Sequence, residues 1–192
     1  MITVDCVRGT LKLVRGAVYD QKVDVIVNAS NRAMRGGSGL NGAIHDLAGP
    51  GLMQELIKVA PDGCETGSVV LTGSHNLPQK YILHAVGPIW GEDDEALSAF
   101  QLVGCYMSSM RITSAIGMKS IAFPSISTGI YGYPIETAII DVIPVLFNTL
   151  MWDESIHLDE VVLALYGESE YDAFETRFTG LQNRLKQLTP SE

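Results

Sequence analysis

A short apolar run that ends in asparagines and glycines most constrains what this chain can fold into. Val25–Val27 is wholly apolar, which is typical of a strand buried on both faces of a sheet, and Asn28 follows at once. The glycine-rich segment Gly36–Gly39 then precedes residues that favour a helix. Glycine N–H groups can approach a ligand closely because no Cβ intervenes, and a helix N-terminus attracts anions. The stretch Asp24–Gly49 therefore predicts an anion site that suits a phosphate.

Length and composition predict one soluble domain over residues 1–192. Of the residues, 46% are hydrophobic and 18% are charged, as in globular proteins. The first residues carry Asp5 and Arg8 where a signal peptide needs an apolar segment. The longest apolar run, Ile139–Trp152, is interrupted by Asp141, Pro144 and Asn148, which is unsuited to a membrane span. We expect a cytoplasmic monomer that does not contact a membrane.

The cysteines and histidines do not predict a metal site. The three cysteines are widely spaced with no C-x-x-C pair, which argues against a disulfide framework and a zinc ribbon: Cys6, Cys64 and Cys105. The four histidines show no metal-ligand spacing: His45, His75, His84 and His157. We therefore expect reduced, packed cysteines and neither a metal nor a cofactor.

The net charge of −9 limits the partners that the chain can bind. Proteins that bind nucleic acid broadly do so through Lys and Arg, which release counterions from the phosphate backbone. An acidic chain is not expected to do this. Any phosphate must be held locally by backbone amides.

The order of the predicted elements indicates an α/β fold. The segments 2–8 and 10–14 predict a hairpin around Gly9, and 17–22 predicts a short turn. Further strands are predicted at 24–27, 69–72, 81–86, 120–123 and 160–166, and helices at 40–48, 51–59, 92–116, 134–152 and 169–188. Helices between buried strands predict a sheet covered on both faces, and the hairpin makes it mixed. Pro144 should kink or split the helix that contains it.

Three predicted buried strands end in residues that suit a ligand. Val27 leads into Asn28–Asn31, Phe123 leads into Pro124–Gly132, and the last strand ends at Tyr166. Ligands of open α/β sheets bind beyond the carboxyl ends of the strands. Two polar loops and one aromatic residue suit a ligand with more than one phosphate and a flat base.

Several familiar motifs are excluded. Gly37–Gly42 matches G-x-G-x-x-G, but eight residues, Asn28–Arg35, separate the strand from even the first glycine of this region. The sequence has no G-K-[ST] for a Walker A loop. It also has no G-x-S-x-G elbow and no Cys/His pair for acyl transfer.

Four motifs together resemble the macrodomain family. They are V-I-V-N-A-S-N, G-G-S-G-L-N-G-A-I-H-D-L-A-G-P, N-L-P-Q-K-Y-I-L-H-A-V-G-P and S-I-A-F-P-S-I-S-T-G-I-Y-G-Y-P. The similarity covers essentially the whole chain in the right order and is closest to the MacroD-like class, which binds ADP-ribose and removes it from acidic side chains. The resemblance implies one three-layer αβα macrodomain with a mixed central sheet, and ADP-ribose or an ADP-ribosylated protein as its partner.

The resemblance also implies a set of ligand-binding residues. Asn31 would contact the distal ribose, the backbone of Val18 would lie near the base, and Tyr166 would stack on adenine. Two loops would surround the diphosphate: Gly36, Gly37, Ser38, Gly39 and Leu40 in one, and Ser125, Ile126, Ser127, Thr128, Gly129, Ile130 and Tyr131 in the other. From the residues alone, Tyr166 could instead be a core aromatic, and Asn28 is favoured as a buried asparagine that ties loop to loop.

Two positions depart from the family pattern. Relatives usually carry an aspartate that recognises the adenine amino group where this chain has Ala17, and Asp20 lies three residues further on. Losing such a charged hydrogen bond costs about 1.5–3 kcal/mol, or roughly tenfold to a hundredfold in affinity. Adenine selectivity is therefore an open question.

The second departure concerns catalysis. MacroD-like hydrolases carry an aspartate at the position of Asn41, ten residues after Asn31, and these two residues are the catalytic candidates. An amide can position a water but cannot take its proton, so general-base help of about 10²- to 10⁴-fold would be missing. Activation of the water by the substrate's own phosphate would preserve part of the rate. Three hypotheses remain: an ADP-ribose binder, a slow hydrolase of ADP-ribosyl esters or O-acetyl-ADP-ribose, and, less favoured, a protein that binds RNA or poly(A) ends.

Overall fold

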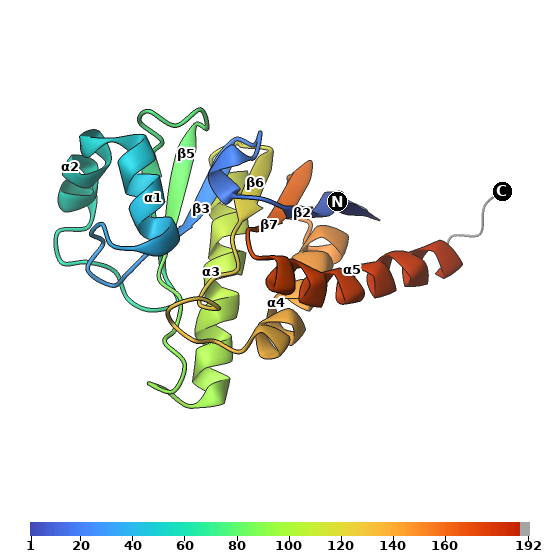
Figure 1. The fold of residues 1–192 in the computed structure, drawn as a ribbon. Helices are drawn as coiled ribbons and strands as arrows, with labels where there is room; N and C mark the ends of the chain where they lie inside the picture. The colour runs from blue at the N-terminus through green and yellow to red at the C-terminus, as the bar shows by residue number, and fades with distance from the viewer. Residues whose placement is uncertain (189–192) are drawn as a thin grey trace.

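The computed structural model describes residues 1–188 as one mixed sheet between two layers of helices (Figure 1). The strands are β1 (Ile2–Cys6), β2 (Gly9–Arg15), β3 (Val25–Ala29), β4 (Val69–Gly73), β5 (Tyr81–Ala85), β6 (Ser120–Phe123) and β7 (Glu160–Leu165). The helices are α1 (Gly39–Ala48), α2 (Pro50–Val59), α3 (Glu95–Ala115), α4 (Ile135–Trp152) and α5 (Glu168–Leu188), with a short 3₁₀ turn, η1 (Val18–Asp20).

The sheet is parallel at its centre and antiparallel at both edges. The strand order is β1-β2-β7-β6-β3-β5-β4. β1 pairs with β2 and β4 pairs with β5 in antiparallel fashion, while the four pairings between β2 and β5 are parallel. The predicted three-layer αβα fold with a mixed sheet is confirmed, including the hairpin in which Cys6 pairs with Gly9.

Each face of the sheet has its own hydrophobic core. Alternate residues of a strand point to opposite faces, and Val25 and Val27 pack toward α3, α4 and α5 whereas Ile26 packs toward α1 and α2. All three are fully buried. The prediction from the apolar run, a strand covered on both faces, is therefore correct.

Element boundaries differ from the prediction in places, and the first is that α3 begins at Glu95 rather than at Glu92. β3 does not stop at Val27 but continues to Ala29, because Asn28 and Ala29 pair with β5 and the buried amide of Asn28 finds partners inside the protein. Pro144 was expected to kink or split its helix, and the helix is not split: α4 runs unbroken from Ile135 to Trp152. The carbonyl that lacks its N–H partner belongs to Ile140, whose side chain is 66% exposed, so water can satisfy that carbonyl.

Among the described residues, α4 is the one helix long and apolar enough to cross a membrane by length and composition. The core helix of a soluble protein passes the same test. Here Val142, Ile143 and Leu146 of α4 are buried in the core.

The parallel strands bring the polar segments that follow β3, β6 and β7 to one edge of the sheet. β3, β6 and β7 are neighbours and run in the same direction, so their carboxyl ends lie side by side. The segment before α1, the loop before α4 and the residues after β7 therefore converge.

Candidate functional site

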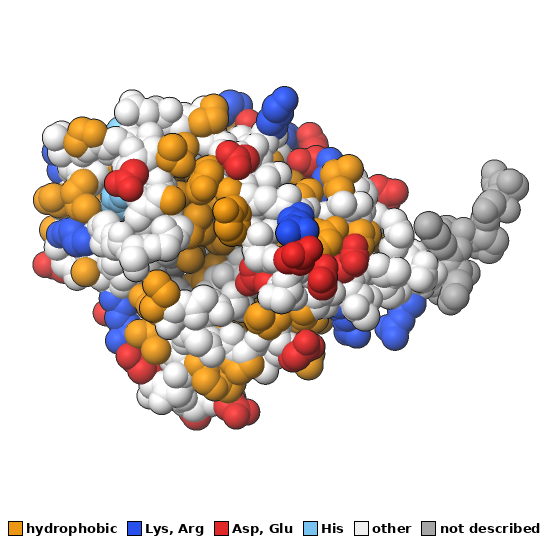
Figure 2. Space-filling view, in the orientation of Figure 1, with side chains coloured by type: hydrophobic (Ala, Val, Ile, Leu, Met, Phe, Trp, Pro, Cys, Tyr) orange, Lys and Arg blue, Asp and Glu red, His pale blue; other side chains and the backbone are white. Residues whose placement is uncertain are grey.

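Two adjoining cavities form a cleft at the carboxyl edge of the sheet. The inner cavity, of about 360 Å³, and the outer cavity, of about 390 Å³, share the lining residues Gly39, Leu40, Ser125 and Gly129. In Figure 2, hydrophobic side chains gather near the centre of this face, in the region between α1 and the start of α5 in Figure 1.

The structure brings together nearly all the residues expected to bind the ligand. The inner cavity is lined by Ala29, Ser30, Asn31, Gly37, Ser38, Gly39, Leu40, Asn41, Gly87, Ser125, Ile126, Ser127, Gly129, Ile130 and Tyr131. The outer cavity is lined by Gly16, Ala17, Val18, Tyr19, Gly39, Leu40, Ala43, Pro124, Ser125, Thr128, Gly129, Ala164, Tyr166 and Glu170. Gly36 is the exception: it lines neither cavity, and its carbonyl oxygen lies 3.4 Å from Asn31 Nδ2.

The loop after β6 lines the inner cavity and contains unsatisfied polar groups. The hydroxyls of Ser125 and Ser127 are buried and have no hydrogen-bond partner among the described residues. Ser127 also has a φ of +68°, a strained conformation for a residue with a side chain. Buried polar atoms normally find partners, and the hydroxyl of Ser127 instead packs against Gly87, so both hydroxyls still have a hydrogen bond to donate.

The N-terminus of α1 forms the opposite wall. Ser38 precedes the helix without capping it by a side-chain hydrogen bond, and Gly39 has a φ of +59° that favours glycine. The first N–H groups of a helix have no partner within it. With the positive end of the helix dipole, they favour an anion between this wall and the loop after β6.

Both polar atoms of the Asn41 side chain are already engaged. Asn41 is 7% exposed. Its Oδ1 accepts a hydrogen bond of 2.8 Å from Asn28 Nδ2, and its Nδ2 donates to the carbonyl of Arg35 at 2.9 Å. The same carbonyl accepts a hydrogen bond of 2.9 Å from Asn31 Nδ2. The two catalytic candidates, Asn31 and Asn41, are thus tied together through one backbone carbonyl.

Asn28 connects Asn41 to a buried histidine that sequence reasoning did not select as a site residue. Its Nδ2 lies 3.0 Å from His84 Nδ1, and His84 Nε2 lies 2.9 Å from Thr72 Oγ1. Burial, with a smaller contribution from His45 and His75, lowers the pKa of His84 to about 3. The imidazole is therefore neutral, accepting from Asn28 and donating to Thr72. The expectation that Asn28 is a buried tie between segments agrees with its full burial and its two partners.

The lining of the outer cavity includes one exposed aromatic ring, Tyr166, and one charged side chain, Glu170. Tyr166 is 79% exposed, so it is not a core aromatic. Ala17 supplies no polar side-chain atom, and Asp20 is exposed and outside the lining. Glu170, in the first turn of α5, is the one Asp, Glu, Lys or Arg side chain that lines this cavity.

Sequence reasoning missed Glu170 and Gly87 as site residues. A Cβ on Gly87 would come within 2.1 Å of Ser127 Oγ, so this glycine makes room for the loop after β6. The available signals were their positions: Gly87 lies in the H-A-V-G-P part of a recognised motif, and Glu170 follows Tyr166 by four residues.

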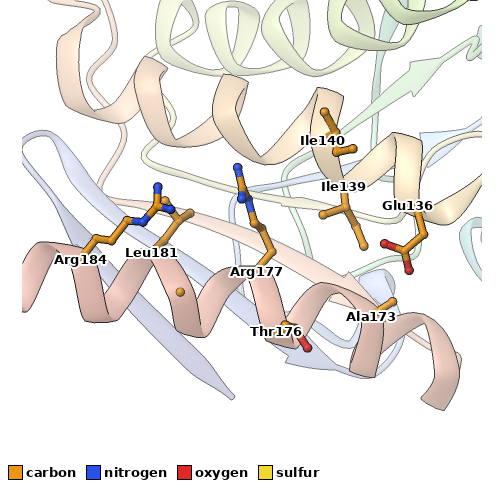
Figure 3. A pocket seen from close by; sticks show the side chains of 9 residues that line it. Glu136, Ile139, Ile140, Ala173, Thr176, Arg177, Leu181 and Arg184 are labelled. Atoms are coloured by element: carbon orange, nitrogen blue, oxygen red, sulfur yellow. The ribbon is translucent and has the colours of Figure 1, made fainter.

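A third cavity, of about 440 Å³, lies between α4 and α5 (Figure 3). Its lining includes Glu136, Ile139 and Ile140 from α4, and Arg177 and Arg184 from α5. It contains no residue of the converging loops. The cleft at the strand ends is therefore the better candidate site, although this groove is larger than either cavity of the cleft alone.

The described residues hold no group of three or more His, Cys, Asp or Glu side chains that could bind a metal ion. Burial raises the pKa of the Cys6 thiol to about 11 and that of the Cys105 thiol to about 12. These thiols are protonated near neutral pH and unsuited to nucleophilic attack.

Comparison with known proteins identifies relatives along the chain. Residues 27–140 match the family model described as Macro domain. A macro domain-containing protein of Caldanaerobacter subterraneus is 40% identical, over 89% of this chain and 97% of its own length. A protein of Pantoea vagans named O-acetyl-ADP-ribose deacetylase 1 is 36% identical, over 85% of this chain and 95% of its own length.

A solved structure resembles the whole fold. A mutant of the Oceanobacillus iheyensis macrodomain, solved with ADPR, superimposes with a TM-score of 0.87 at 33% identity. The match covers 94% of this chain and 97% of that protein. With a family match over more than half of its residues and relatives of this similarity, the chain belongs to the macro domain family.

Proposed function

We propose that this protein binds ADP-ribose, or a closely related nucleotide, in the cleft at the strand ends and hydrolyses ADP-ribosyl bonds weakly or not at all. The observation that carries the binding proposal is that the N-terminal residues of α1 line the same cavity as the loop after β6, in which the hydroxyls of Ser125 and Ser127 have no partner among the described residues. The Oceanobacillus macrodomain solved with ADPR, which has the same fold, supports the identity of the ligand.

The two cavities divide the proposed ligand into its parts. The diphosphate lies between Gly37–Leu40 and the loop Ser125–Tyr131, where backbone N–H groups are available. The distal ribose lies in the inner cavity beside Asn31, and the base lies in the outer cavity against Tyr166. An exposed aromatic ring at a cleft rim suits stacking on a flat base.

Apart from the phenol of Tyr131, the described residues that line the inner cavity supply no acid or base for hydrolysis. Its lining residues include no Asp, Glu, His or Cys. Asn41 cannot accept a proton, and its amide is held by Asn28 and Arg35. General-base catalysis is typically worth about 10²- to 10⁴-fold, and this contribution is absent from the lining. The function supported best is therefore binding.

An active hydrolase is the alternative, acting on mono-ADP-ribosylated acidic side chains or on O-acetyl-ADP-ribose. The Pantoea relative, which carries the name of a deacetylase, favours it. Without a protein base, the water would have to be activated by a phosphate of the substrate. We further propose that the partner is an ADP-ribosylated protein and that the protein acts as a cytoplasmic monomer.

Calorimetry tests the binding proposal. Titration with ADP-ribose should give a dissociation constant in the micromolar to sub-millimolar range, because the walls that hold the diphosphate are present. ADP and free ribose 5-phosphate should bind more weakly, since each lacks contacts in one part of the cleft. Absence of heat at millimolar ADP-ribose would rule out the assigned ligand.

The substitution Asn41→Asp tests the catalytic proposal. The introduced carboxylate can still accept the hydrogen bond from Asn28 and can act as a base, so hydrolysis of an ADP-ribosylated glutamate should rise by about 10- to 1,000-fold. It loses the donor to the Arg35 carbonyl, which should lower the free energy of unfolding by about 1–3 kcal/mol. Single-turnover release of ADP-ribose measures the first effect and urea unfolding the second.

The variant Asn41→Ala serves as the control for the broken hydrogen bonds. Like Asn41→Asp it loses the donor to the Arg35 carbonyl, and it also loses the acceptor for Asn28, but it introduces no base, so its turnover should stay at or below that of the wild type. Wild-type turnover equal to that of Asn41→Asp would show that the missing carboxylate does not limit the rate.

A further inference from the structure

The outer cavity has one charged side chain in an otherwise uncharged lining. Glycine, alanine, valine, leucine, proline, serine, threonine and tyrosine make up the rest of its wall, and Glu170 supplies a carboxylate. Figure 2 shows further acidic side chains over the first turns of α5, where this helix begins beside the cleft. A base in this cavity therefore meets one strong hydrogen-bond acceptor.

Glu170 is held in position by the loop that closes the cleft. The hydroxyl of Thr128 donates to Glu170 Oε1 at 2.7 Å, and Thr128 Oγ1 also lies 3.1 Å from the carbonyl of Ser125. Thr128 and Glu170 both line the outer cavity. The contact engages one carboxylate oxygen and leaves Oε2 without a hydrogen-bond partner among the described residues.

Other acidic residues nearby do not share this role. Glu168, two residues earlier in the same turn of α5, forms an ion pair of 3.0 Å with Arg15 and does not line the cavity. Asp20 is exposed and also lies outside the lining. Ala17, which does line it, has no side-chain acceptor. Glu170 is therefore the group through which this cavity can distinguish bases by their donors.

We propose that Glu170 is the specificity-determining residue for the base, accepting a hydrogen bond from an exocyclic amino group and so favouring adenine over hypoxanthine. The inference rests on the proposed function, because it requires a nucleotide in the cleft. Hypoxanthine carries a carbonyl oxygen where adenine has its amino group, and that oxygen would face the carboxylate. Guanine presents two adjacent donors that match two free carboxylate oxygens, whereas Thr128 already occupies one of them here.

Glu170 has two competing roles that would not select a base. As an acidic residue in the first turn of α5, it could act only on helix stability through the helix dipole. As an anion near the proposed diphosphate, it could act only by repulsion. If Glu170 acted only on the helix, neutralising its carboxylate would leave all nucleotide affinities unchanged. If it acted only by repulsion, neutralising it would raise the affinity for every nucleotide by the same factor.

The test compares ADP-ribose, inosine diphosphate ribose and guanosine diphosphate ribose by calorimetry on the full chain. The wild type should bind ADP-ribose about 10- to 100-fold more tightly than the inosine compound, as expected for a hydrogen bond to a charged group. In Glu170→Gln the acceptor becomes neutral, and in Glu170→Ala it is removed. The dissociation constant of the inosine compound divided by that of ADP-ribose should fall several-fold in Glu170→Gln and approach one in Glu170→Ala.

Glu168→Gln is the matched control, because it removes the same charge from the same turn at a side chain outside the cavity. It should leave the ratio unchanged. Thermal unfolding without ligand identifies any variant that is not folded. If Glu170→Ala does not fold, Glu170→Gln is compared with the wild type instead.

The outcomes separate this inference from the proposed function. The inference is supported if the ratio of dissociation constants falls in the Glu170 variants and keeps its wild-type value in Glu168→Gln. A wild-type ratio near one, or equal shifts for all three nucleotides in Glu170→Gln, overturns it while ADP-ribose binding stands. Failure of the wild type to bind any of them refutes the proposed function, and the inference with it.

Discussion

Gly87 lies where β5 has ended and the loop after β6 comes close to the backbone. A Cβ at this position would lie 2.1 Å from Ser127 Oγ and 2.5 Å from Ile126 Cγ2, both far inside normal contact distances. Ser127 is also strained, with a φ of +68°. The shape of the inner cavity thus depends on one missing side chain next to a residue with little freedom to move.

Gly87→Ala should weaken the binding of ADP-ribose at least tenfold, because the displaced Ser127 and Ile126 line the inner cavity. Overpacking of this kind should also lower the free energy of unfolding by about 1–3 kcal/mol. Calorimetry and urea unfolding measure the two effects.

Gly180→Ala provides the matched control for Gly87→Ala. A Cβ at Gly180, inside α5, would meet nothing within 4 Å. This variant should keep the wild-type affinity and gain about 0.5–1 kcal/mol of stability, since alanine favours a helix. Unchanged ligand affinity in Gly87→Ala would show that the loop accommodates the new methyl group.

At the scale of secondary-structure elements, a buried polar chain links three neighbouring strands to α1. It runs from Thr72 in β4 through His84 in β5 and Asn28 in β3 to Asn41 in α1. A neutral His84 accepts from Asn28 Nδ2 while it donates to Thr72, which fixes the orientation of the Asn28 amide. The sheet thereby positions the side chain of Asn41 from behind the cleft.

The burial of His84 in this row of hydrogen-bonded side chains predicts how stability depends on pH. The pKa of His84 is about 3 in the folded protein against 6.5 ordinarily, so the unfolded chain binds more protons between these values. Stability is therefore complete above about pH 6.5 and is lost as the pH falls, by about 1.4 kcal/mol per pH unit. Burial also lowers the pKa of His45, which adds to the loss.

Urea unfolding between about pH 7.5 and pH 5.5 should show a loss of at least about 1.4 kcal/mol. Nuclear magnetic resonance of the folded protein provides a second measurement: the His84 ring should show no titration above about pH 5. A titration midpoint of His84 near the ordinary histidine value would contradict its burial between Asn28 and Thr72.

The sequence predicted the elements better than it predicted how polar side chains are used between them. The apolar run at Val25–Val27 correctly predicted a strand buried on both faces, since its periodicity is local information. The extension of β3 through Asn28 could not be predicted, because it depends on His84, a partner 56 residues away. Glu170 was missed for the same reason: its importance comes from contact with Thr128 across the cleft.

At the scale of the whole molecule, an acidic protein is proposed to bind an anionic ligand. The net charge is −9, and no Lys or Arg is among the described residues that line either cavity. Local backbone N–H groups and hydroxyls must then supply the attraction, while the overall field opposes the approach of the ligand. Salt separates these contributions, because it screens long-range repulsion and leaves short hydrogen bonds nearly unaffected.

The affinity for ADP-ribose should therefore stay constant or rise, within about threefold, when ionic strength increases from about 0.05 M to 0.5 M. Sodium gluconate is the suitable salt, since its bulky anion competes less than chloride for the N–H groups. Ile130→Lys provides the comparison: Ile130 is 79% exposed on the rim of the inner cavity, and a cation there adds attraction that salt screens. Its affinity should exceed that of the wild type at low salt and fall toward it at high salt. A tenfold loss of wild-type affinity over the same range would mean that cationic side chains, rather than the backbone of the two loops, hold the diphosphate.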